Sequence, residues 1–119
     1  MPLLAALSFH SAANDQLQPT YRFCEDPWPP YTVGETSLPP KAGMAVELFE
    51  ELEQRLGMAF HLRLLPWKRC LLWAKEGKYD GVMLLTRNKD RSRYLSFSVA
   101  VHQDANVVWA LKSRTFERD

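Results

Sequence analysis

The segment GMAVELFEELEQRLGMAFHLRLL, residues 43–65, contains two hydrophobic periods in succession. In its first half, apolar residues recur every three or four positions, which predicts a helix over 44–56 with Gly57 as its C-cap. In its second half, apolar and polar residues alternate over 59–65, which predicts a strand with one solvated face at a sheet edge. The apolar positions of the helix are Val46, Phe49, Leu52 and Leu56.

The segments on either side continue this alternation of strands and helices. We expect a strand over 21–25 before the helix, and a second helix over 67–76 after the edge strand. The nearly continuous apolar run 80–86 predicts a central strand covered on both faces, and 105–111 predicts a final strand. This order is typical of an α/β fold with an open, mainly parallel sheet flanked by helices.

Length and composition fit one globular domain. The chain has 119 residues, of which 46% are hydrophobic, and this is enough to fill one core. A net charge of +1 argues against a nucleic-acid partner, which favours a strongly basic surface. No apolar run approaches the roughly 18 to 20 residues of a membrane-spanning helix. The histidines are isolated from one another and from the cysteines, so we expect no metal site, and no motif indicates a cofactor.

Residues 1–18 differ from the rest of the chain. Residues 3–9 are mostly apolar and residues 11–13 are small, as at a signal-peptidase site, but no basic residue comes before them. We interpret residues 1–18 as the remnant of a secretion signal, and a disordered N-terminus is the alternative. Residues 19–119 are then the folded part of the chain.

The segments that follow the predicted strands combine aromatic rings, prolines and cations. They are EDPWPPY at 25–31, PWKR at 66–69 and TRNKDR at 86–91. Ligands of open α/β sheets bind beyond the carboxyl ends of the strands, where these three segments lie. Their chemistry suits a small, partly apolar anion, and no nucleophile has a base beside it. Cys24 and Cys70 also fall near this edge, so a disulfide is possible, and two buried thiols are the alternative.

Taken in order, the motifs resemble the amino-acid-type family of periplasmic solute-binding proteins, the extracellular family 3, over residues 20 to 112. The motifs that carry the resemblance are 25–31, 43–48, 65–69, 77–81, and 86–91 leading into 96–98. The resemblance implies a single lobe of a type II periplasmic-binding fold. Family members continue for about the same length again, so it also implies that 19–119 is an incomplete first lobe.

The resemblance further implies a set of ligand-binding residues. Trp28 and Trp67 match aromatic walls of the site, Arg91 matches the arginine that grips a ligand carboxylate, and Thr86 matches a hydroxyl that bonds the same group. The full predicted set is Glu25, Trp28, Tyr31, Trp67, Thr86 and Arg91.

Three departures from the family pattern leave the ligand open. Ala45, Leu84 and Asn88 stand where the family has an acidic residue, a small hydroxyl residue and a threonine. Polar contacts to an α-amino group are therefore missing. The expected ligand is an amino acid, a peptide fragment or another small organic acid.

The function predicted on this basis is binding of a small polar solute in the periplasm, for uptake through the membrane component of an ABC transporter or for sensing. One alternative is an enzyme on the same fold, similar to cyclohexadienyl or arogenate dehydratase. Glu25 and Asp26 are then the only candidate acids, and they lack a histidine in the turn. A sensory input lobe of a signalling protein is the other alternative.

Overall fold

The computed structural model describes residues 18–114. The predicted secretion-signal segment 1–18 therefore lies, apart from Gln18, outside the described residues. The strands are β1 (Thr20–Glu25), β2 (Ala59–Leu64) and β3 (Gly81–Val82), and the helices are α1 (Met44–Leu56), α2 (Trp67–Lys75) and the short 3₁₀ helix η1 (Arg91–Arg93). No helix within residues 18–114 is long and apolar enough to cross a bilayer.

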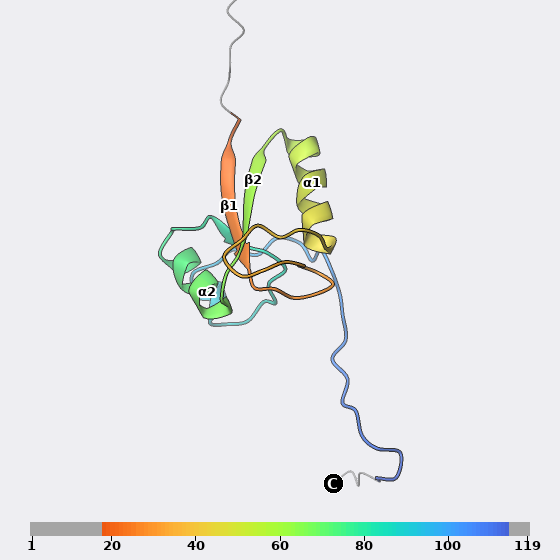
Figure 1. The fold of residues 1–119 in the computed structure, drawn as a ribbon. Coiled ribbons are helices and arrows are strands. Elements are labelled where there is room, and N and C mark those ends of the chain that lie inside the picture. The colour runs from red at the N-terminus through yellow and green to blue at the C-terminus, as the bar shows by residue number, and fades with distance from the viewer. Residues whose placement is uncertain (1–17, 115–119) are drawn as a thin grey trace, which may run out of the picture.

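The three strands form one parallel sheet in the order β2-β1-β3. The α1 and α2 helices lie on opposite sides of this sheet (Figure 1). Right-handed crossovers through helices produce this arrangement when strands and helices alternate along the chain. The predicted fold class, an open parallel sheet flanked by helices, is confirmed.

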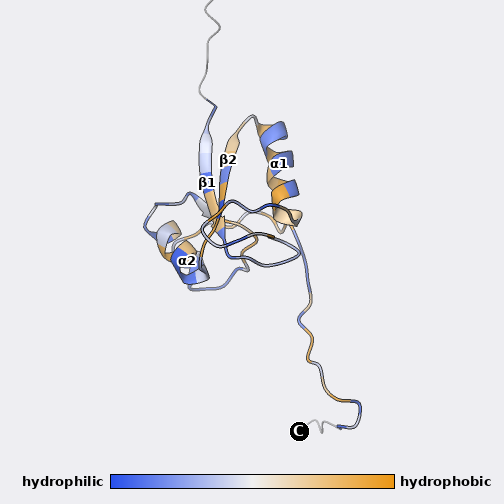
Figure 2. Ribbon diagram, viewed as in Figure 1, coloured by the Kyte–Doolittle hydropathy of each residue, from blue (hydrophilic) through white to orange (hydrophobic). Residues whose placement is uncertain are grey.

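Alternation along the strands divides the core into two clusters. Phe23 of β1 and Phe60 of β2 face α1, and the ring centroids of both lie 5.0 Å from that of Phe49. Figure 2 shows apolar residues of α1 and the strands on the facing surfaces. On the opposite face Cys24 packs with Leu65 and Cys70 under α2. The two clusters fix both helices relative to the sheet.

A disulfide bond joins Cys24, near the end of β1, to Cys70 in α2. Its Cα atoms are 5.7 Å apart and both cysteines are fully buried. Trp67, at the start of α2, lies one helical turn before Cys70. The cross-link therefore holds the first turn of α2 against the carboxyl end of the central strand.

Two predictions of strands were wrong. The run 80–86 forms only the two-residue β3 at the edge of the described sheet, because the chain turns at Leu84, which has a positive φ of 47°. The central position belongs to β1 instead. Residues 105–111 run away from the sheet (Figure 1). They form no strand, because no strand of residues 18–114 lies beside them to pair with. Trp109 in this segment is 89% exposed.

Candidate functional site

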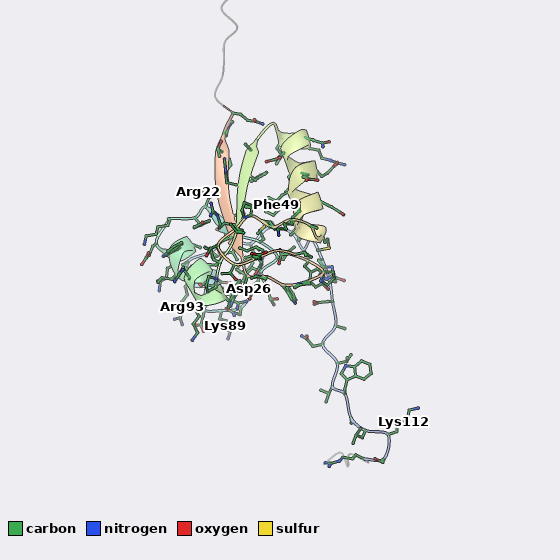
Figure 3. All side chains as sticks on the ribbon, viewed as in Figure 1. Arg22, Asp26, Phe49, Lys89, Arg93 and Lys112 are labelled. Carbon is green, nitrogen blue, oxygen red and sulfur yellow. A yellow bond between two sulfur atoms is a disulfide. The ribbon has the colours of Figure 1, made fainter. Side chains whose placement is uncertain are left out.

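The carboxyl ends of the strands meet at one edge of the sheet. The amide of Leu65, directly after β2, donates a hydrogen bond of 2.7 Å to the carbonyl oxygen of Glu25 at the end of β1. In Figure 3, Asp26 lies at the same end of the molecule as Lys89 and Arg93, whereas Arg22 lies further along the sheet. The predicted segments 25–31 and 66–69 follow β1 and β2 at this edge, and segment 86–91 reaches it through the contact of Arg91 with Trp67.

Arg91 is held at this edge by both a hydrogen bond and an aromatic ring. Its Nη1 donates a 2.8 Å hydrogen bond to the carbonyl oxygen of Thr86, and its Cζ lies 5.3 Å from the ring centroid of Trp67. The backbone amide of Arg91 donates to Oδ1 of Asn88 at 2.8 Å. Within residues 18–114, the guanidinium forms no ion pair with a carboxylate. Its remaining N–H groups are therefore free to bind an anion, in the planar geometry that fits a carboxylate.

Thr86 and Asn88 both form hydrogen bonds with Arg91. The backbone carbonyl of Thr86 orients the Arg91 guanidinium, and the role of the Thr86 hydroxyl in binding the ligand stays a prediction. Asn88 was regarded as a lost polar contact, yet its side chain fixes the start of η1. Asparagine favours such local side-chain to backbone hydrogen bonds, and this tendency could have been recognised from the sequence.

The turn after β1 is organised by Thr32, which sequence reasoning did not select. Its buried Oγ1 accepts a hydrogen bond from the Trp28 amide at 2.9 Å and donates one to the Asp26 carbonyl at 2.8 Å. These bonds fix the backbone on both sides of the proline-rich turn. Trp28 as a residue remains 42% exposed, and its ring centroid is 4.6 Å from that of Tyr31.

The same turn is docked on the start of α1. The carbonyl oxygen of Tyr31 accepts a 3.0 Å hydrogen bond from the amide of Ala45. Gly43 has a φ of 120°, and an added Cβ there would overlap the Tyr31 carbonyl. A glycine is thus required where this turn meets the helix.

Glu25 is the most perturbed titratable group of the edge. Its residue exposure is 2%, its Oε1 accepts the Asp26 amide at 3.1 Å, and its buried Oε2 has no partner within residues 18–114. Burial, and next the Asp26 side chain, raise the pKa of Glu25 from 4.5 to about 9, although the Asp26 amide and the Arg91 guanidinium act in the opposite direction. At neutral pH this side chain is therefore an uncharged carboxylic acid.

The predicted residues form two groups at this edge. Arg91 contacts both Trp67 and Thr86, and Trp28 contacts Tyr31. Glu25, at the end of β1, is close enough to Arg91 for the guanidinium to influence its pKa. Two surface hollows of about 560 and 230 Å³ lie elsewhere, and neither is lined by a predicted site residue. Residues 18–114 contain no cluster of metal-ligating side chains.

Comparison with known families shows to which family the chain belongs. The model of the bacterial extracellular solute-binding proteins, family 3, matches residues 22–117. The match covers most of the chain, so the chain belongs to this family, and the resemblance seen in its motifs is confirmed. The fold is consistent with a single lobe of a periplasmic-binding fold. Family membership supports a general role in binding a small-molecule solute, and the family consists mainly of binding proteins without enzymatic activity. No curated protein and no solved structure matches the chain.

Proposed function

We propose that this chain binds a small organic acid, an amino acid or a related carboxylate, at the carboxyl ends of β1 and β2. The observation that carries the proposal is the orientation of Arg91, whose guanidinium is bonded to the Thr86 carbonyl and stacked over Trp67. An arginine held in this way has already lost much of its side-chain freedom, so less entropy is lost when a ligand binds.

The expected contact energies of this site are of the size that micromolar binding requires. Two charge-assisted hydrogen bonds from Arg91 contribute about 1.5 to 3 kcal/mol each. Stacking on the exposed Trp28 ring adds about 0.5 to 1.5 kcal/mol beyond the area it buries. Micromolar affinity requires about 8 kcal/mol, so burial of the apolar part of the ligand supplies the remainder.

We place this binding activity in the periplasm, with residues 1–18 as the export signal and 19–119 as part of a first lobe. The disulfide between Cys24 and Cys70 supports this location, because such bonds persist in oxidising compartments. Family 3 of the extracellular solute-binding proteins supports it as well. The partner would be the membrane component of an ABC importer, or a sensory protein that uses the same lobe.

Glu25 favours a second candidate, a dehydratase-like enzyme on the same fold. A buried carboxylic acid that is uncharged at neutral pH can donate its proton to a departing hydroxyl group, which then leaves as water. In a prephenate-like acid, the electron pair for the new double bond comes from the C–C bond to a substrate carboxylate, which leaves as CO₂, and a carboxylate remains at position 25. Incubation with prephenate-like acids, followed by absorbance of the product, tests this alternative directly.

Calorimetry with matched ligand pairs tests the main proposal. Each pair consists of a small carboxylic acid and its neutral primary amide, for example phenylacetate with phenylacetamide and hexanoate with hexanamide. We expect measurable heat for at least one acid and at least tenfold weaker binding of its uncharged partner. Equal affinity for an acid and its amide would show that the carboxylate is not what the site recognises.

A further inference from the structure

Three aromatic side chains form a connected row beside the turn after β1. The ring centroid of Tyr31 lies 4.6 Å from that of Trp28 and 4.9 Å from that of His102. His102 belongs to the segment after η1, and its Nε2 lies 3.2 Å from the Tyr31 hydroxyl, a hydrogen-bonding distance. Tyr31 therefore links the exposed indole of Trp28 to an imidazole that comes from a distant part of the chain.

The three residues are held to different degrees. The backbone of Trp28 is fixed by Thr32, and that of Tyr31 by the Ala45 amide. Trp28 is 42% exposed as a residue, and its indole packs against the Tyr31 ring. The hydroxyl of Tyr31 has His102 as its hydrogen-bonding partner within residues 18–114. The orientation of the indole thus depends on Tyr31, and that of Tyr31 on His102.

We propose that His102 is a positioning residue of the ligand site, which holds Tyr31 so that Trp28 presents a flat face to the ligand. This inference rests on the proposed function and narrows its ligand class to carboxylates with a flat, unsaturated body. A flat ring gains stacking energy on an exposed indole that a flexible aliphatic chain does not gain. The carboxylate of the same ligand is left to Arg91.

His102 contributes little else to the structure. Its side chain is 31% exposed. Besides the Tyr31 hydroxyl, Nε2 has the exposed Asp104 as a neighbour, with Oδ2 4.0 Å away. It belongs to neither buried core cluster. Its replacement should therefore leave the lobe folded, and loss of one neutral hydrogen bond should change affinity by about 2- to 10-fold.

Calorimetry with phenylacetate and hexanoate separates positioning from a general effect. His102→Ala and Tyr31→Phe should each weaken phenylacetate binding by about 2- to 10-fold and leave hexanoate binding unchanged. The double variant should be no weaker than either single variant, because both remove the same bond. His102→Gln, which retains a hydrogen-bonding group, should restore part of the affinity. His61→Ala, at an exposed histidine on β2, is the matched control and should change nothing.

The contrary results distinguish failure of the proposed role of His102 from failure of the proposed function. If phenylacetate binds no more tightly than hexanoate, if the two acids lose affinity equally, or if the effects of the two single variants multiply, the role of His102 is contradicted while the carboxylate site stands. If the wild-type protein binds neither acid nor any other carboxylate, the proposed function fails and the role of His102 fails with it.

Discussion

The guanidinium of Arg91 lies over the indole of Trp67, with its Cζ 5.3 Å from the ring centroid. The two residues come from different elements, η1 and the first turn of α2, and the disulfide of Cys70 anchors the latter to β1. A cation stacked on an aromatic face keeps its N–H edge available for hydrogen bonds. This pairing connects the fold of the lobe to its proposed ability to hold an anion.

Trp67→Ala should weaken carboxylate binding without unfolding the lobe. The cation–π contact contributes about 0.5 to 1 kcal/mol at an exposed position, so we expect about a 2- to 5-fold loss of affinity. Trp67→Phe retains an aromatic face and should retain most of the binding. Titration calorimetry of both variants checks this, and equal losses for the two would show that the ring is not what supports Arg91.

Glu25 should make the stability of the protein depend on pH. Folded Glu25 keeps its proton up to about pH 9, whereas an unfolded glutamate loses it near pH 4.5, so the folded state binds more protons between these values. The contribution of Glu25 to the free energy of unfolding is thus fully present below about pH 4.5 and is lost as the pH rises through about 9. Glu25→Gln removes this pH-dependent contribution to the free energy of unfolding, because glutamine does not titrate.

Urea unfolding over this pH range measures the effect. The stability of Glu25→Gln relative to the wild type should increase steadily as the pH rises through the window. The control is Glu50→Gln, at an exposed position of α1, and its curve should run parallel to that of the wild type. A Glu25→Gln curve that is also parallel would mean that Glu25 is ionised in the folded protein.

Removal of the disulfide should destabilise the protein strongly. The cysteines are 46 residues apart, and closing a loop of this size lowers the entropy of the unfolded chain enough to contribute about 4 kcal/mol. The paired variant Cys24→Ala with Cys70→Ala should therefore unfold at a much lower urea concentration. Addition of a reductant should lower the urea midpoint of the wild type and leave that of the paired variant unchanged. An unchanged midpoint for the paired variant would show that the cross-link adds nothing to stability.

Much of the fold could be predicted because the deciding signals are local. The apolar spacing between Gly43 and Gly57 defines α1 with the bounds that the structure gives. The strand order could not be predicted, because the central strand β1 contains Arg22 and Glu25 and looks less apolar than the run that forms β3. That run indicates burial, but its length as a strand depends on the backbone turn at Leu84.

The segment 105–111 shows a second limit of local patterns. Its valines favour a strand, yet a strand requires a neighbour, and residues 18–114 provide none beside it. At the site, motif order was enough to select Arg91 and Trp67, which the structure places in contact. The contact between Tyr31 and His102 spans 71 residues and leaves no local signal, so it could be found only in three dimensions.

Thr32 should be needed for the shape of the turn that presents Trp28. Thr32→Val keeps the volume but leaves the Asp26 carbonyl without its donor and the Trp28 amide without one acceptor, so we expect a loss of about 1 to 3 kcal/mol in the free energy of unfolding. Thr32→Ser keeps the hydroxyl and should cost less. Thermal unfolding of the two variants compares them, and a larger effect of serine than of valine would point to packing rather than to hydrogen bonding.

Replacement of Arg91 is the most direct test of the site. In calorimetric titrations with the tightest-binding carboxylate, Arg91→Ala should lose two charged hydrogen bonds, about 3 kcal/mol or more, and thus at least about 100-fold in affinity. Arg91→Lys keeps the charge but not the planar pair of donors, and its affinity should lie between those of the wild type and Arg91→Ala. Wild-type affinity in Arg91→Ala would contradict the proposal that this guanidinium holds the ligand.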